Sequence, residues 1–131
     1  MNPVVHFEMP YSDRERMVDF YVKSFGWKPH LMGAEMGNYV VMMTSEMGKD
    51  GFPTKPGRIN GGMFPKTAGA AHPSIVIAVE DIRKHVRIVS DAGGKLLGEI
   101  MPIPGIGEVA VFLDTEGNRV SMIQPSMKGS P

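Results

Sequence analysis

Two segments of the chain repeat one pattern of apolar and polar positions at an offset of 68 residues. A strand-like run at residues 4–9 leads into a stretch with helical periodicity that ends at Gly26, and a second strand-like run at residues 74–79 leads into a similar stretch that ends at Gly94. The chain has 131 residues, the size of a single domain. The repeat therefore predicts one structural unit built twice within one domain.

Each strand-like run is followed by a predicted helix with one apolar face. The face of the first helix is rich in aromatic residues, namely Met17, Phe20, Tyr21 and Phe25. The face of the second is aliphatic, namely Ile82, Val86 and Val89. Residues 12–15 give the first helix a capping box, and Gly26 can supply the left-handed residue at its end. We expect both helices to pack against sheets.

Three segments rich in strand-forming residues follow each predicted helix. They are residues 27–32, 39–44 and 58–63 in the first copy, and residues 95–100, 108–113 and 119–123 in the second. Each copy thus has the order strand, helix, strand, strand, strand. This order predicts an α+β fold of two βαβββ modules, module one at 1–66 and module two at 72–125, with a tail at 126–131.

A long connection at residues 45–57, rich in Gly, Pro and Lys, joins two predicted strands of module one. Such a segment is either a solvated excursion or a lid over a site.

Composition excludes several classes of function. Fourteen basic and fourteen acidic side chains cancel, so the charge that favours nucleic acid or anionic membranes is missing. The absence of cysteine removes disulfides, thiolate metal ligands and thiol nucleophiles. No apolar run approaches the length of about 20 residues that a spanning helix needs. We expect a soluble, cytoplasmic protein with no nucleic-acid or membrane partner.

Strand alternation places His6 and Glu8 on one face of the first strand, because Val5, Phe7 and Met9 should face the helix. A histidine and a carboxylate at such positions can hydrogen-bond, which would raise the imidazole pKa and fix its tautomer. The pair could then move a proton or anchor a polar group of a ligand. The alternative is that backbone or water satisfies both side chains at a wet sheet surface.

Alternation also predicts apolar neighbours for this pair. Tyr39 and Met43 share a face of one strand, and Ser121 and Ile123 share a face of the last strand. Of the twelve methionines, we expect most to fill the core, with Met42, Met43 and Met63 as the exceptions that line a cavity. The expected site is mostly apolar with few polar anchors, as small-molecule sites commonly are.

Several short motifs occur in a characteristic order along nearly the whole chain. They are His6–Pro10, Asp13–Trp27, Gly61–Pro65, Val79–Ile82, Ala92–Lys95, Ile103–Gly105 and Asp114–Asn118. In these motifs the chain resembles the vicinal oxygen chelate superfamily, and within it the glyoxalase-like subgroup related to lactoylglutathione lyase. The superfamily includes glyoxalase I, bleomycin-binding resistance proteins, fosfomycin-modifying enzymes and extradiol dioxygenases. The resemblance implies that the two modules form a curved eight-stranded sheet around a central cavity, and it implies a homodimer.

Metal-dependent members of that superfamily take ligands from the first and last strand of each module. The resemblance places these positions at His6, Ser74 and Ser121, with the fourth near Gly61. One histidine, two neutral hydroxyls and a glycine make a poor cage for a divalent ion, so a metal cofactor is disfavoured. A weaker alternative brings together His6, Glu8 and His72, if the strand that begins module two extends that far. Glyoxalase I chemistry is disfavoured for the same reason.

The leading hypothesis is a metal-independent glyoxalase-like protein that binds a small, partly apolar organic molecule in the cavity between the modules. The expected ligand-binding residues are His6, Glu8, Tyr39, Met43, Met63, Ser74, Ser121 and Ile123. The alternative is a lyase, an isomerase or another enzyme in which His6 and Glu8 are the acid and base, with or without a divalent metal. A third hypothesis is an interaction subunit whose cavity is vestigial.

Overall fold

The computed structural model of the protein describes residues 1–126. These residues form two compact units, one of residues 6–73 and one that joins residues 1–5 to the segment from Ser74 onward. The sequence did not predict that the first five residues belong with the second module. They do so because the Pro3 carbonyl accepts a hydrogen bond from the Ala78 N–H at 2.9 Å. The tail predicted at 126–131 lies, apart from Ser126, outside the described residues.

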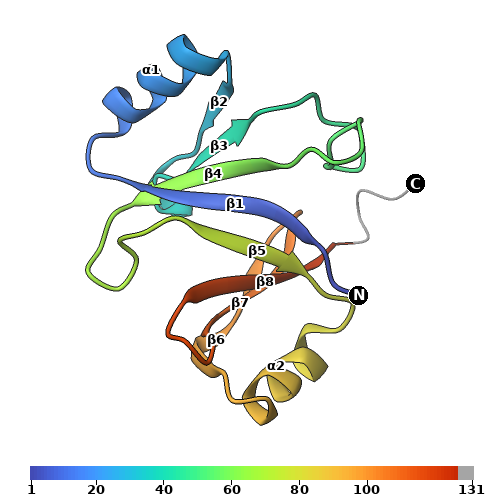
Figure 1. The fold of residues 1–131 in the computed structure, drawn as a ribbon. Helices are drawn as coiled ribbons and strands as arrows, with labels where there is room; N and C mark the ends of the chain where they lie inside the picture. The colour runs from blue at the N-terminus through green and yellow to red at the C-terminus, as the bar shows by residue number, and fades with distance from the viewer. Residues whose placement is uncertain (127–131) are drawn as a thin grey trace. The chain divides into compact units, whose positions relative to one another are not determined.

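Module one contains a helix, a short 3-10 helix and four strands (Figure 1). The elements are β1 (Val4–Tyr11), α1 (Arg14–Phe25), β2 (Lys28–Leu31), η1 (Ala34–Met36), β3 (Val40–Met43) and β4 (Asn60–Pro65). The strands lie in the order β2-β3-β4-β1, with β1 parallel to β4 and the other neighbours antiparallel.

Module two repeats this arrangement (Figure 1). Its elements are β5 (Ser74–Ala78), α2 (Ile82–Asp91), β6 (Lys95–Ile103), β7 (Gly107–Leu113) and β8 (Arg119–Pro125). The order is β5-β8-β7-β6, again with the first and last strands of the module parallel. The prediction of an α+β fold with two βαβββ modules is confirmed, and η1 is an addition that the sequence pattern did not predict.

Both helices begin at an aspartate that caps them in the same way. The Asp13 side chain accepts from the Arg16 N–H at 3.0 Å, and the Asp81 side chain accepts from the Lys84 N–H at 3.1 Å. These bonds satisfy amide donors that a helix start leaves unpaired. The N-cap is Asp13, not Ser12, so the predicted capping box is wrong by one residue.

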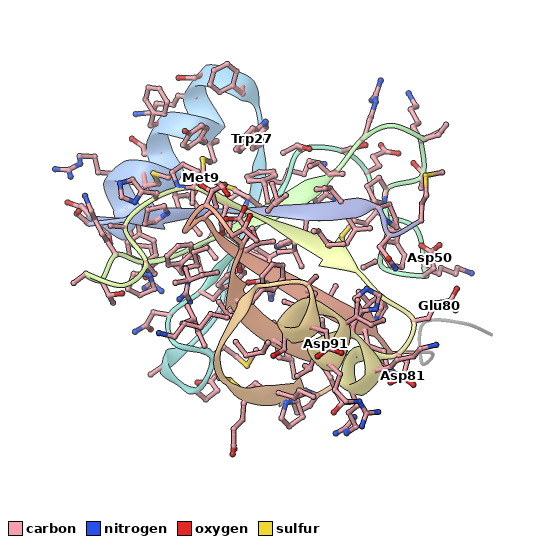
Figure 2. The ribbon with its side chains drawn as sticks, turned by 60° about the horizontal axis from the view of Figure 1, so that its bottom comes forward. Met9, Trp27, Asp50, Glu80, Asp81 and Asp91 are labelled. Atoms are coloured by element: carbon pink, nitrogen blue, oxygen red, sulfur yellow. The ribbon has the colours of Figure 1, made fainter. Side chains whose placement is uncertain are left out.

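The first helix buries less of its aromatic face than we expected. Met17, Val18 and Tyr21 pack on the core of module one, whereas Phe20 and Phe25 remain 55% and 63% exposed. The Tyr21 ring stacks on Trp27 at a centroid distance of 4.7 Å, and Phe25 lies at the edge of this aromatic group, 6.0 Å from Trp27. Figure 2 labels Trp27 and Met9 near this helix.

Each module has its own core of buried apolar side chains. The fully buried residues of module one include Val40, Met42 and Met63, and those of module two include Ile82 and Met122. Burial of such side chains is the main stabilising contribution in a domain of this size.

The connection at residues 45–57 is mostly exposed and carries a small bridge of its own between Met47 and Pro53. The Gly48 N–H donates to the Phe52 carbonyl at 2.7 Å, which closes the turn around Asp50. Whether this connection serves as a lid stays a prediction. Among residues 1–126, no helix has the length and apolar character needed to cross a membrane.

Candidate functional site

Three polar side chains of module one form a hydrogen-bonded chain. His6 Nε2 lies 2.9 Å from the Tyr39 hydroxyl, and that hydroxyl donates to Glu8 Oε2, also at 2.9 Å. His6 and Glu8 are both half-buried. The sequence predicted a contact between His6 and Glu8, and the structure links them through the tyrosine.

The alternation of β1 directs His6 and Glu8 to the side of the sheet opposite α1, which we call the His6 face. Tyr39 is the residue just before β3, and its side chain reaches across β4 to Glu8. It can do so because the strand between them carries Gly62, the register partner of Glu8. A Cβ on Gly62 would overlap the Tyr39 phenol, so this close approach requires glycine.

The neighbouring Gly61 serves the opposite face of the same strand. It pairs with Phe7, and a Cβ there would overlap the Phe7 ring, which lies at a centroid distance of 5.6 Å from Trp27. The adjacent glycines thus admit the tyrosine on the His6 face and the aromatic core on the helix face.

The Tyr39 hydroxyl has a single proton, and this proton determines which atoms donate and which accept in the two hydrogen bonds. Because that proton is donated to Glu8, the hydroxyl oxygen accepts from His6, which places the imidazole proton on Nε2. As long as the imidazole is neutral, Nδ1 is then its unprotonated acceptor.

Burial sets the protonation states of the chain. Desolvation lowers the pKa of His6 from 6.5 to about 4, so the imidazole is neutral at pH 7. Desolvation, followed by the charge of Glu8 and the hydrogen bond to it, raises the pKa of the Tyr39 phenol far above its usual range. We expected the carboxylate to raise the histidine pKa, and this expectation is wrong because His6 bonds to Tyr39 and burial lowers its pKa.

Two of the predicted methionines lie outside this face. Met63 is completely buried and packs with Val40 and Met42 beneath α1, so it cannot line the His6 face. Met42 is buried in the same core. Met43 is half-buried and alternates with Met42, which places it on the His6 face. The expectation of a cavity role is therefore corrected for Met42 and Met63.

The predicted residues of module two lie on the face of its sheet opposite α2. Ser121 is 5% exposed and pairs with Val76 of β5, two residues beyond Ser74. Ile123 follows on the same face and pairs with Ala78. By this register the module-one counterpart of Ser121 is Gly62, one residue beyond the position near Gly61 that the sequence indicated.

The positions at which the resemblance implies metal ligands do not provide enough suitable donor atoms. In module one, His6 Nε2 and Glu8 Oε2 are engaged with Tyr39, and Gly62 has no donor. His72 is exposed and precedes β5, so the strand does not extend to it as the His6, Glu8 and His72 alternative required. Within residues 1–126, His, Asp and Glu side chains form no group of three or more that could hold an ion. The residues present do not fit a divalent metal.

One polar residue of this face escaped the sequence reasoning. Asn60 is the register partner of His6 and is 6% exposed. Its Oδ1 accepts from the Thr44 N–H at 2.8 Å and from the Ser45 N–H at 3.0 Å. A polar amide directly before two glycines in a strand was the available signal.

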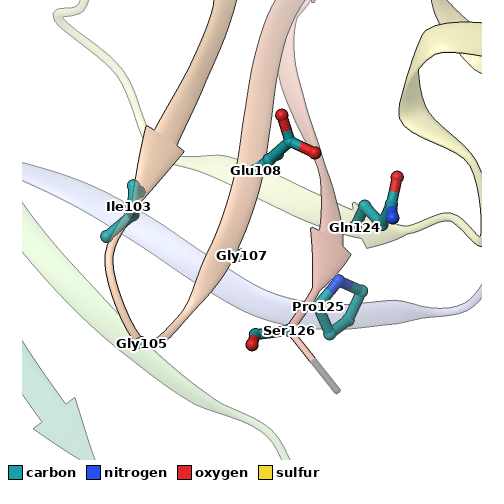
Figure 3. Close-up of a pocket in the computed structure, with 7 residues that line it drawn as sticks. All are labelled: Ile103, Gly105, Gly107, Glu108, Gln124, Pro125 and Ser126. Atoms are coloured by element: carbon teal, nitrogen blue, oxygen red, sulfur yellow. The ribbon is translucent and has the colours of Figure 1, made fainter. Parts of the chain in front are cut away.

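Two cavities lie away from the polar chain. One, of about 280 Å³, is at the ends of β7 and β8 beside Glu108, Gln124 and Pro125 (Figure 3). Glu108 also forms a bidentate ion pair with Arg83, with N···O distances of 3.0 and 2.8 Å. The other, of about 430 Å³, lies by Asp13 at the start of α1.

The sequence of residues 4–122 matches the model of the Glyoxalase/Bleomycin resistance protein/Dioxygenase superfamily. The chain belongs to this superfamily. The resemblance found in its motifs is thereby confirmed.

Relatives of this superfamily member include named proteins of plants and fungi. An Arabidopsis thaliana protein named probable lactoylglutathione lyase, chloroplastic, is 28% identical over 88% of the chain. The chain spans 33% of that protein's length. A glyoxylase-like domain-containing protein of Didymella fabae is 30% identical over 85% of the chain and 84% of its own length.

Solved structures of methylmalonyl-CoA epimerases share the fold of this superfamily member. One, in complex with methylmalonyl-CoA and NH4+, has a TM-score of 0.72 at 14% identity and covers 100% of this chain and 99% of its own. The Mycobacterium tuberculosis epimerase has a TM-score of 0.68 at 13% identity over 95% of this chain and 89% of its own. At these identities the likeness establishes the fold alone.

Proposed function

We propose that the protein binds a small, partly apolar organic molecule on the His6 face and does so without a divalent metal ion. The observation that carries this proposal is the chain from His6 through Tyr39 to Glu8, which presents a neutral imidazole with an acceptor at Nδ1. A fixed neutral acceptor among apolar side chains is what an uncharged ligand with one donor group requires.

Metal independence is supported by the donors themselves. The first strands of the modules carry His6 and Ser74, and the last strands carry Gly62 and Ser121 at equivalent register positions. Neutral hydroxyls are weak ligands for zinc, nickel, iron or manganese. The single imidazole is already oriented by Tyr39.

A thermal-shift screen tests both parts of the proposal. Chelator-treated protein is screened against a metabolite library, with and without added Zn²⁺, Mn²⁺, Ni²⁺ or Co²⁺. We expect ligands that raise the melting temperature equally in the presence and absence of metal, because binding to the folded state alone stabilises it. Ligands that bind only after one metal has been restored would refute metal independence.

Tyr39→Phe tests whether the hydrogen-bonded residues His6, Tyr39 and Glu8 anchor the ligand. The substitution removes the hydroxyl that fixes the His6 tautomer, so we expect affinity for a ligand found in the screen to fall by about tenfold. Tyr21→Phe is the matched control, because the Tyr21 hydroxyl contacts Met9 Sδ at 3.8 Å on the helix side of the same module. Equal affinity in both variants would contradict the assignment of the anchor.

Catalysis is the second candidate function, and the hydrogen bonds from His6 through Tyr39 to Glu8 favour it. A proton accepted at His6 Nδ1 would leave an imidazolium whose Nε2–H is connected through Tyr39 to the Glu8 carboxylate. Relatives named as a lyase and as epimerases show that enzymes share this superfamily or fold. The lowered pKa of His6 makes it a weak base at pH 7, which is why binding is our first proposal.

His6→Ala separates the two functions. A binder should lose affinity by about tenfold, whereas an enzyme should lose turnover by a factor of roughly 100 to 10,000 while ligand still binds. The homodimer that the resemblance implies stays a prediction, and light scattering of the purified protein checks it.

A further inference from the structure

Asn60 carries a buried hydrogen-bond donor that its structural role does not use. The oxygen of the side chain accepts from two backbone N–H groups, those of Thr44 and Ser45, and so holds the start of the connection after β3. The nitrogen, Nδ2, is buried and has no partner within residues 1–126. A buried unpaired donor costs free energy, so a group that pairs with it is stabilised there.

The geometry of the amide indicates where this donor points. Two N–H donors require an oxygen opposite them, which fixes which end of the amide is Oδ1. That oxygen is held on the β3 side of β4 by the amides of Thr44 and Ser45. We infer that Nδ2, at the other end of the same planar amide, lies toward β1, where His6 is the register partner of Asn60.

A donor and an acceptor therefore adjoin on the His6 face. Residues paired in a parallel ladder carry side chains on the same face of adjacent strands, which lie about 4.8 Å apart. The acceptor is His6 Nδ1: the bond to Tyr39 places a proton on Nε2, and burial, which lowers the pKa of His6 to about 4, leaves Nδ1 without one at pH 7. One ligand that offers an N–H beside a C=O can satisfy both.

We propose that Asn60 Nδ2 and His6 Nδ1 together recognise a cis-amide, the group found in lactams and pyridones, with its carbonyl on Asn60 and its N–H on His6. The inference rests on the proposed function, because it names the ligand class of the same face. A ring amide holds its donor and acceptor side by side, carries no charge, and has apolar edges that suit Met43 and Val41, which share this face of β3.

Three small probes test the proposal by NMR titration of the full chain. 2-Pyridone offers both groups, N-methyl-2-pyridone offers the carbonyl alone, and pyrrole offers the N–H alone. We expect 2-pyridone to bind about tenfold more tightly than either of the others, the factor for one neutral hydrogen bond. Equal affinity for 2-pyridone and its N-methyl form would overturn the inference without any variant.

Asn60→Asp then removes the donor and keeps an oxygen for the Thr44 and Ser45 amides. We expect its affinity for 2-pyridone to fall about tenfold, to the level of pyrrole, whereas its weak affinity for pyrrole stays the same. Thr44→Val is the matched control, since it removes the hydroxyl that donates to the Ile59 carbonyl at 2.6 Å and to Asn60 Oδ1 at 3.4 Å, and leaves both backbone amides and Asn60 Nδ2 in place. It should bind 2-pyridone like the unaltered protein.

The remaining outcomes separate this inference from the proposed function. Unchanged affinity in Asn60→Asp means that the donor pairs with water only, which overturns the inference. An equal loss in Thr44→Val assigns the effect to the connection after β3, which also overturns it. Failure of all three probes while the metabolite screen finds metal-independent ligands would reject the cis-amide and leave the proposed function standing.

Discussion

Module one and module two share a scaffold but differ in the face that it presents. Both have a helix capped by an aspartate, a parallel pair of first and last strands, and a methionine buried at the same register position, Met63 and Met122. On the face away from its helix, module one carries His6 and Glu8.

Module two carries Ser74 and Val76 at the corresponding positions, 68 residues later. Its last strand has Ser121 where module one has Gly62. His6 and Glu8 do not form the hydrogen-bonded chain by themselves, because Tyr39 connects them. The missing side chain of a glycine on the next strand admits the tyrosine that connects them. The comparison shows that repeated core positions maintain the fold, whereas a few unrepeated positions on the opposite face distinguish one module chemically.

The largest expected effect tests what the modules share. Met63→Ala and Met122→Ala each leave a cavity beneath a helix, and each should lower the free energy of unfolding by about 3 kcal/mol. Urea denaturation measures both. Met43→Ala on the His6 face should cost less, and a loss equal to that of Met63→Ala would contradict the division between core and face.

The next effect tests what the modules do not share. Gly62→Ala places a Cβ against the Tyr39 phenol and should cost about 2 kcal/mol through overpacking. Ser121→Ala at the equivalent position of module two should cost less than about 1 kcal/mol. The control is Gly69→Ala, because a Cβ on Gly69 meets open space. Equal losses at Gly62 and Ser121 would remove the distinction between the two faces.

The histidine predicts a pH dependence that belongs to module one. Its pKa is lowered from 6.5 to about 4 in the folded protein, so between these values the unfolded chain binds more protons. The free energy of unfolding should therefore fall as pH decreases from 6.5 to 4, by about 2 kcal/mol after allowance for partial solvation.

His6→Gln keeps an N–H for Tyr39 but does not titrate, so it should lose this component. Chemical denaturation across the pH range measures the difference between the two proteins. Parallel pH profiles would contradict the lowered pKa of His6 in the folded protein.

The smallest expected loss of stability concerns the helix caps that both modules share. Asp13→Ala and Asp81→Ala each remove one capping hydrogen bond, and each should cost about 1 kcal/mol. Thermal unfolding of the two variants should give similar shifts. A clearly larger loss at Asp13 would show that the two helix starts are not equivalent.

Much of the fold could be predicted from local sequence. Helical and strand periodicity predicted the element order, and Gly26 was predicted to end the first helix because a left-handed cap depends on residues close in sequence. The start of that helix was predicted one residue too early. The exposure of Phe20 and Phe25 could not be predicted in this way, because helical periodicity does not show how much of an apolar face the sheet covers.

The candidate site was predicted in part. Alternation in one strand placed His6 and Glu8 on the same face. The same rule does not say which residue of another strand lies opposite, so it missed Asn60 and gave Met63 the wrong side. The direction of the His6 pKa shift also failed, because desolvation depends on what surrounds the side chain and not on its neighbours in sequence.

Local sequence patterns were enough to predict the two βαβββ modules, the end of the first helix at Gly26, and the placement of His6 and Glu8 on one face of their strand. These features depend on residues a few positions apart. The tertiary structure decided that Tyr39, separated by 33 and 31 residues from its partners, joins them, and that Asn60 keeps a buried donor beside His6. Such contacts depend on strand register and on the space that Gly62 leaves open, and both are fixed when the strands pair.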